Sequence, residues 1–190
     1  MQSLKSEMRK MNLKRDEHAL GLIEEQINSV RKTTNYRILE YPIETIVGKF
    51  TKSVDVIDKG ACTEIYISNS HRNFIWDKTR QSKFIESLFM DLPIPYLFVV
   101  DVKNDGCLEI LDGYQRIETL RRFVNNELKL QKLERLDKLN GWNFFDLTEP
   151  MKRIFNVHTL RVVRLTYKCD DTTRKDIFRR LNNKPVISGR

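Results

Sequence analysis

Apolar residues recur at helical spacing in several parts of the chain, beginning near the N-terminus. Residues 13–32 carry one narrow apolar stripe between charged positions, formed by Leu20, Ile23, Ile27 and Val30. This spacing predicts an amphipathic helix. The helix either docks on the rest of the domain, which is the more ordinary arrangement, or pairs with another chain as a homo-oligomer. We therefore expect a helical extension over residues 1–35 and a domain over residues 36–190.

The same spacing predicts further helices, several of them with recognisable start signals. Pro42 suits the first position of a helix, and Asp77 suits the capping position of another, because its carboxylate can accept hydrogen bonds from the free N–H groups there. Asp170 and Asp171 can cap the last helix in the same way. The predicted helices span about residues 42–50, 78–90, 114–128, 133–139 and 172–181.

Strands are predicted where apolar residues alternate with polar ones or form short continuous runs. The predicted strands span residues 63–68, 95–102, 107–111 and 157–167, and residues 52–60 form a loop or a further short strand. The turn signal Asn104-Asp105-Gly106 joins the second and third strands into a β-hairpin. Because strands and helices are interspersed, the sequence predicts a single α/β domain of mixed α+β character.

Composition excludes some classes of protein. The chain has 190 residues, 40% of them hydrophobic, which suits one domain with a packed core. No apolar run approaches the ~18 residues of a membrane span, and the N-terminus has no secretory signal. The three cysteines are far apart and odd in number, so we expect neither a disulfide framework nor a zinc site, and a reducing cytoplasm is the natural compartment. They are Cys62, Cys107 and Cys169.

Positive charge is concentrated towards the C-terminal end. The formal net charge is +8, and residues 151–190, with eleven Lys or Arg against three Asp or Glu, account for all of it. Such a segment is typical of nucleic-acid binding, although a solvated face without a partner has the same composition. The residues that we expect to contact DNA are Arg161, Arg164, Lys168, Arg174, Lys175, Arg179 and Lys184.

The strongest candidate for chemistry is the turn Asp112-Gly113-Tyr114-Gln115-Arg116, where an apolar strand passes directly into a helix. The first N–H groups of a helix have no partner within it, and the helix dipole is positive there, so such a turn can bind an anion. Arg116 can add a bidentate cation for phosphate, and Asp112 can hold a metal ion, orient a water molecule or simply cap the helix. A purely structural strand–turn–helix has the same pattern.

Two other segments hold residues suited to a phosphate site. Arg72 lies in a turn-rich loop before Trp76, where a surface arginine beside a core tryptophan is the alternative. The last predicted helix ends in Arg179-Arg180-Leu181-Asn182, where at least one arginine is available to a partner and the asparagine can also be a C-cap. The chain has no HExxH, Walker A or GxSxG pattern, and no metal-ligand spacing among His18, His71 and His158.

In this order and separation, these segments resemble the DGQQR-motif family. That family is the ParB/sulfiredoxin-like domain found at the N-terminus of GmrSD-type modification-dependent restriction enzymes and in other bacterial phage-defence proteins. The resemblance covers about residues 40–190 and rests on Arg72, Trp76, Pro93-Ile94-Pro95, Asp112-Gly113-Tyr114-Gln115-Arg116 and Phe178-Arg179-Arg180-Leu181-Asn182.

The resemblance implies a fold, a site and partners. The fold would be a small mixed sheet flanked by helices, and the motif turn would bind and often hydrolyse a nucleoside triphosphate with Mg²⁺. Asp112, Gln115 and Arg116 would form the catalytic core, with Asp112 also at the metal. The nucleotide would further contact Arg72, Gly113, Tyr114, Arg180 and Asn182. The turnover would be tied to DNA, to a nuclease or to another subunit of a defence complex.

Several positions depart from the family pattern. Tyr114 replaces the first Gln of the motif, and His71 replaces the Gln before Arg72. Glu118 stands where a small hydroxyl residue is usual, and a carboxylate near bound phosphate would repel it. A Gly-Gly pair after Asn182 is absent and no HNH-type region follows. The domain is therefore expected to be truncated at its C-terminus, to act with another chain, or to have lost hydrolysis.

Three functions remain open from the sequence. The first is metal-assisted NTP hydrolysis in a restriction or phage-defence system, or direct cleavage of DNA at the same site. The second is a DNA-binding module, or nuclease subunit, that binds nucleotide or phosphate without turnover. The third is a structural protein that joins a defence complex through the 13–32 helix.

Overall fold

The computed structural model describes residues 18–32, 35–51, 65–67, 73–101, 107–166 and 171–182. Its centre is a six-stranded sheet in the order β1-β6-β4-β5-β3-β2. The strands are β1 (Tyr36–Pro42), β2 (Phe50–Thr51), β3 (Ile65–Tyr66), β4 (Leu97–Asp101), β5 (Leu108–Asp112) and β6 (Thr159–Leu165). β1 is antiparallel to β6 and β4 to β5, whereas the other three pairings are parallel. The sheet is therefore mixed, and the predicted α/β class is confirmed.

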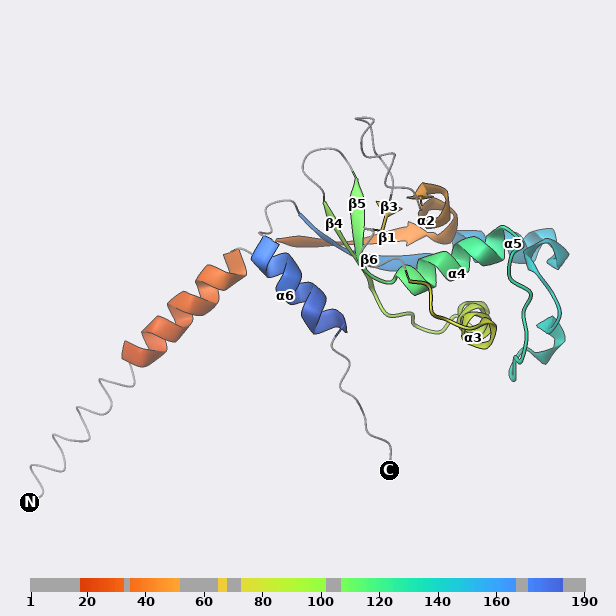
Figure 1. Ribbon diagram of the computed structural model, residues 1–190, viewed down its shortest axis with the longest axis horizontal. Helices are drawn as coiled ribbons and strands as arrows, with labels where there is room; N and C mark the ends of the chain where they lie inside the picture. Colours follow the sequence, from red (N-terminus) through yellow and green to blue (C-terminus); the bar gives the residue numbers. More distant parts are fainter. Residues whose placement is uncertain are drawn as a thin grey trace, which may run out of the picture.

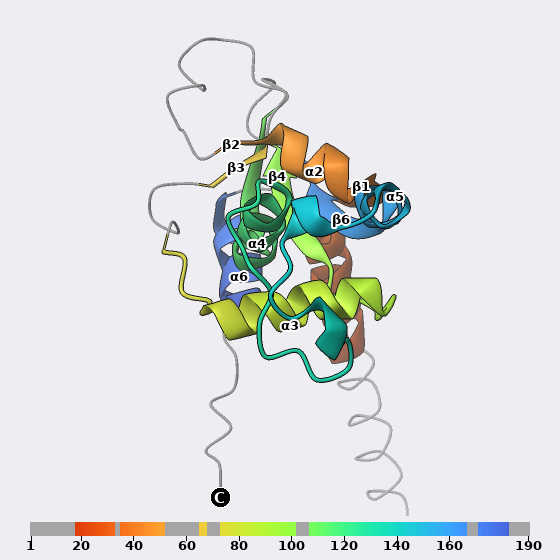
Figure 2. The same ribbon diagram turned by 90° about the vertical axis from the view of Figure 1, so that its right-hand side faces the viewer.

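Four α-helices cover one face of the sheet and one lies on the other (Figures 1 and 2). The first group is α2 (Ile43–Lys49), α3 (Lys78–Phe89), α4 (Tyr114–Val124) and α5 (Glu149–Val157). Their buried faces and the facing strand residues form the main core, in which the Phe123 ring of α4 makes edge contacts with Phe144 and Phe155, with ring centroids 5.6 and 5.3 Å apart. On the opposite face, Ile177 of α6 (Asp171–Asn182) packs on a smaller cluster with Val100 and Val163.

Most predicted elements are present, with changed bounds. The 95–102 and 107–111 pair is the antiparallel β4–β5 hairpin, although its turn lies outside the described residues. The helix predicted to end at residue 128 ends at Val124, because Asn126 adopts a left-handed φ of 65°. The helix predicted over residues 133–139 is only a 3₁₀ turn, η3 (Asp137–Leu139), and a second such turn, η4 (Phe144–Asp146), was not predicted.

Two elements differ from the sequence prediction. Residues 36–42 form β1, whereas the sequence suggested only a helix beginning near Pro42; that residue ends the strand and α2 follows at once. α5 occupies residues 149–157, where the sequence predicted mixed structure up to Pro150, no element over residues 151–156 and the start of a strand at Val157. Pro150 lies in the first turn of α5, the one helical position that proline suits.

The N-terminal helix spans residues 18–32 within the described chain and extends away from the sheet (Figure 1). Its apolar side chains are not buried: Leu20 is 58% exposed, Ile23 50% and Ile27 44%. The expectation that this helix docks on the domain is therefore wrong, because the narrow stripe finds no complementary surface in the described part. Pairing with another chain stays a prediction.

The sequence composition argued against a membrane span and against disulfide bonds. Among the described helices, none is long and apolar enough to cross a membrane. The expectation about cysteines is wrong at Cys107, which precedes β5, is buried and is disulfide-bonded. Sequence spacing alone missed this bond, because disulfide formation depends on spatial proximity.

Candidate functional site

The turn between β5 and α4 has a backbone that only glycine suits. Gly113 is the N-cap of α4 with φ of 107°, a region that side chains strongly disfavour. A Cβ at this position would overlap Cδ2 of Leu97 in the neighbouring strand. Among the residues that the structure describes, no side chain caps α4, and the first turn of this helix has no acidic residue. The positive end of the helix dipole is thus not offset by a local carboxylate in that turn.

Arg116 and Asp112 face each other across this turn. Arg116 Nη2 donates to Asp112 Oδ2 at 2.6 Å. The same guanidinium donates to the carbonyl oxygens of Pro95 and Tyr96, which precede β4. The Arg116 side chain is 11% exposed and that of Asp112 is 34% exposed. Arg116 therefore ties the start of one strand to the end of the next, and the carboxylate is the more accessible member of the pair.

Burial and pairing act in opposite directions on Arg116. Burial lowers the pKa of the Arg116 guanidinium, whereas the Asp112 carboxylate raises it by charge and by the hydrogen bond. Arginine starts from a pKa so high that the group stays charged at neutral pH. Asp112 Oδ1 accepts no hydrogen bond within the described part of the chain, so one carboxylate oxygen remains available to a ligand.

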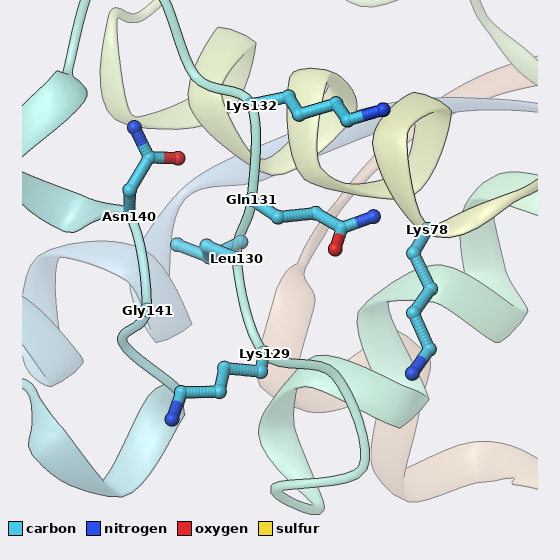
Figure 3. Close-up of a pocket in the computed structure, with 7 residues that line it drawn as sticks. All are labelled: Lys78, Lys129, Leu130, Gln131, Lys132, Asn140 and Gly141. Atoms are coloured by element: carbon cyan, nitrogen blue, oxygen red, sulfur yellow. The ribbon is translucent and has the colours of Figure 1, made fainter.

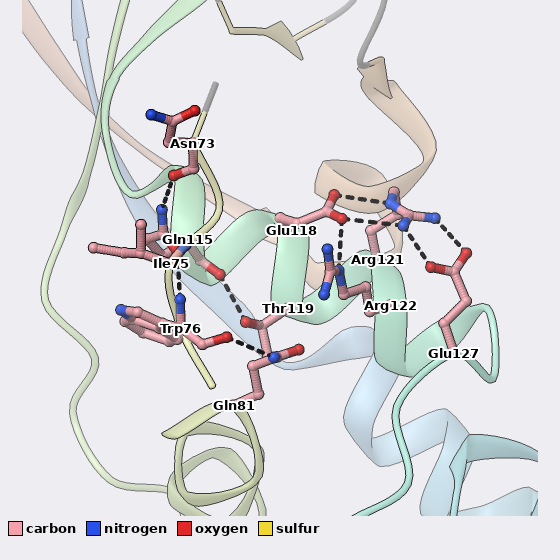
Figure 4. A network of polar contacts seen from close by, with 10 residues as sticks. All are labelled: Asn73, Ile75, Trp76, Gln81, Gln115, Glu118, Thr119, Arg121, Arg122 and Glu127. Atoms are coloured by element: carbon pink, nitrogen blue, oxygen red, sulfur yellow. Dashed lines mark hydrogen bonds and ion pairs between the residues drawn. The ribbon is translucent and has the colours of Figure 1, made fainter. Parts of the chain in front are cut away.

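Gln115 holds the loop that enters α3. Its Oε1 accepts hydrogen bonds from the backbone N–H groups of Ile75 (2.9 Å) and Trp76 (3.2 Å), and its Nε2 donates to the Asn73 carbonyl at 2.7 Å (Figure 4). These three hydrogen bonds of the Gln115 amide all go to a segment about forty residues earlier in the chain. Arg72, the neighbour of Asn73 in sequence, lies outside the described residues.

An aromatic group lies beside the motif turn. The Tyr114 ring, which stands where the family pattern has Gln, makes a tilted contact with Phe50 and an edge contact with Phe74, both with centroids 6.3 Å apart. The guanidinium of Arg122 lies over the Phe74 ring, 3.9 Å from its centroid. Tyr114 thus serves in part as a packing residue.

Glu118, whose carboxylate the sequence led us to expect to repel bound phosphate, forms ion pairs with two arginines of its own helix. Its carboxylate is fully buried and accepts from Arg121 Nε at 2.9 Å and Arg122 Nε at 2.8 Å (Figure 4). Arg121 also pairs with Glu127 at 2.6 Å. Spacings of three and four residues on one helix favour such pairs, so the pattern Glu118-x-x-Arg121-Arg122 in itself indicates them.

Within the described residues, no hydrogen bond or ion pair links Arg180 of α6 to the turn between β5 and α4. Arg180 Nε pairs with Asp176 on its own helix at 2.7 Å, and α6 contacts β5, the strand that leads into the turn. The side chain of Asn182 lies outside the described residues. The contribution of these two residues to a phosphate site stays a prediction.

The residues predicted to contact DNA divide into three groups. Arg161 and Arg164 have ion-pair partners, Glu40 at 3.1 Å and Asp101 at 2.6 Å, and Arg174 donates to the Asp101 carbonyl at 3.3 Å. Lys175 and Arg179 are exposed on α6. Lys168 and Lys184 lie outside the described residues.

Comparison with known proteins identifies the class. The model of the GmrSD restriction endonuclease N-terminal domain matches residues 9–186, so the chain belongs to this family. Membership supports a role in restriction and defence. No curated protein and no solved structure matches the chain.

Proposed function

We propose that this chain is the nucleotide-binding and NTP-hydrolysing domain of a bacterial DNA restriction system, with the β5–α4 turn as its site. The observation that carries the proposal is the left-handed Gly113 at the start of α4, where no side chain of the described residues caps the helix and the first helical turn has no acidic residue. N–H groups and the dipole at such a start favour phosphate. The available oxygen of Asp112 lies one residue before it.

Arg116 acts in this proposal as a positioning residue. Its guanidinium is occupied by Asp112 and by two backbone carbonyls, so it holds the carboxylate and the strand end in place. Gln115 has a parallel role towards residues 73–76. Arg72, one residue before this segment, is proposed to contact phosphate directly, and Arg180 and Asn182 are proposed to close the site.

Mg²⁺ is the proposed cofactor. The described residues contain no group of three or more His, Cys, Asp or Glu side chains arranged for a metal ion. The available Oδ1 of Asp112 fits Mg²⁺ held by one carboxylate and by the phosphates of a nucleotide, which is a common arrangement for this ion. Asp112 would be the protein ligand, and the ion would neutralise charge that develops on the transferred phosphoryl group.

A second candidate is a DNA-binding module that senses nucleotide without turnover. The exposed Lys175 and Arg179 on α6, within the segment that carries the net positive charge, favour this function. Such binding would weaken steeply with salt, because each neutralised phosphate releases counterions.

The test is Mg²⁺-dependent binding of a fluorescent nucleotide to wild type, Asp112→Asn and Asp101→Asn. Asp101 is a matched control because its carboxylate also pairs with an arginine at 2.6 Å. Asp112→Asn should weaken Mg²⁺-dependent binding by about tenfold or more, corresponding to ~1.4 kcal/mol. The control should bind as wild type does. Equal binding by all three proteins would contradict the assignment of Asp112.

A further inference from the structure

A pocket lined by lysines shares no residue with the motif turn. This pocket of about 370 Å³ is formed between the first residue of α3 and two facing stretches of the segment that follows α4 (Figure 3). Its lining consists of Lys78, Lys129, Leu130, Gln131, Lys132, Asn140 and Gly141. This volume is within the range of ~300–1,000 Å³ that is usual for small-molecule sites.

The lining residues that the structure describes carry three positive charges and no carboxylate. Lys78, Lys129 and Lys132 are exposed, and none of them forms an ion pair or a side-chain hydrogen bond within the described chain. The nearest acidic residue in sequence is Asp77, whose carboxylate caps α3 by accepting from Arg80 N at 2.7 Å. Three uncompensated lysines around one concavity create a local positive potential that favours an anion.

The walls of the pocket are fixed by hydrogen bonds. Leu130 N donates to the Trp142 carbonyl and Gly141 N donates to the Leu130 carbonyl, both at 2.8 Å, so the two stretches are paired. The Asn140 side chain accepts from Leu133 N at 2.9 Å and donates to Leu133 O at 3.1 Å.

The same segment is also tied to α3. Gln131 N donates to Ser82 Oγ at 3.0 Å, and the buried Glu86 carboxylate accepts from Arg135 N and Leu136 N at 2.9 and 2.8 Å. Lys132 has a left-handed φ of 55°, a conformation that non-glycine residues adopt only where the surroundings fix it. The pocket is thus held open by the fold before a ligand arrives.

We infer that this pocket binds a phosphate-bearing ligand, with Lys78, Lys129 and Lys132 as the cationic contacts and the Gln131 amide as a neutral donor. The inference goes beyond the proposed function, because it concerns a different set of residues and holds whether or not the β5–α4 turn hydrolyses nucleotide. The phosphate can come from a DNA backbone or from a free nucleotide, and both present the same chemistry to lysine.

The experiment compares Lys129→Gln/Lys132→Gln with Lys49→Gln/Lys138→Gln. The second protein is a matched control, because Lys49 and Lys138 are exposed lysines outside the pocket and the change in net charge is the same. Anisotropy of a labelled short DNA duplex is measured at several salt concentrations, and binding of ATP and of pyrophosphate is measured by calorimetry. Asp112→Asn is included, since it should leave this pocket intact.

If the ligand is DNA, the pocket variant should lose about tenfold in duplex affinity and its salt slope should fall by about 2, as expected for two lost phosphate contacts. If the ligand is a nucleotide, Asp112→Asn should still bind pyrophosphate and ATP at this pocket. The Lys129→Gln/Lys132→Gln variant should lose that binding. The control should keep both. Equal changes in the pocket variant and the control for every probe would overturn the inference.

Discussion

Arg116 binds Asp112 one helical turn away, at 2.6 Å, across the glycine that begins α4. The pair joins the end of β5 to the first turn of the helix, and the same guanidinium reaches back to the carbonyls of Pro95 and Tyr96. The sequence predicts Arg116 as a phosphate ligand. In the fold, its guanidinium holds the Asp112 carboxylate in place.

Arg116→Ala should destabilise the protein and not only impair nucleotide binding. The substitution leaves a carboxylate and two carbonyls without their donor, which should lower the free energy of unfolding by about 2–3 kcal/mol. Urea denaturation of wild type, Arg116→Ala and Arg116→Lys measures this, and the lysine variant should lose less because it keeps the charge without the planar fork. Wild-type stability in the alanine variant would mean that Arg116 is a direct ligand and not a positioning residue.

Gly113→Ala should be strongly unfavourable. The φ of 107° and the overlap of a Cβ with Leu97 should together cost about 1–3 kcal/mol or more of stability. Gly48→Ala is the control, because Gly48 lies in α2 with no atom within 4 Å of an added Cβ and should gain about 0.5–1 kcal/mol. Thermal unfolding of the two variants should therefore shift in opposite directions, and a shift in the same direction would contradict the described turn.

Glu118→Gln tests the buried ion-pair group. Removing the charge leaves Arg121 and Arg122 without a buried counterion, so a loss of about 3 kcal/mol in the free energy of unfolding is expected. Glu127→Gln removes the half-exposed partner of Arg121 and should cost about 1 kcal/mol or less. Chemical denaturation measures the free energy of unfolding of both variants. Comparable losses in the two would show that Glu118 is not the central residue of the ion-pair group.

Gln115→Ala should release residues 73–76 without unfolding the domain. Three hydrogen bonds are lost, two of them from the amides of Ile75 and Trp76. Hydrogen exchange at those two amides should rise by about tenfold or more, whereas exchange within β4 and β5 should not change. Unchanged protection at Ile75 and Trp76 would mean that the loop is held by other contacts.

The sequence predicts the local elements of this fold but not its long-range contacts. The β4–β5 hairpin and the start of α4 were readable, because apolar runs and the glycine after Asp112 act locally. β1 was not, because its exposed Tyr36 and Ile38 form a strand only by pairing with β6 more than 120 residues later. The three bonds of Gln115 to residues 73–76 likewise link distant segments, so its role as a loop anchor could not be predicted.

The docking of the N-terminal helix failed for a related reason. Periodicity shows which side chains share a face, but not whether the rest of the domain offers a surface to receive them. The ion pairs of Glu118 are the opposite case, since they are local and the spacing of three and four residues could have revealed them.

Phosphate release from the four common nucleoside triphosphates with Mg²⁺, with and without duplex DNA, tests the central claim most directly. Wild type and Asp101→Asn should release phosphate, and Asp112→Asn should lose the activity by about a hundredfold or more, as expected when the group that holds the metal is removed. Release that is equal in Asp112→Asn and wild type, or absent with every nucleotide in wild type, would contradict hydrolysis at the β5–α4 turn.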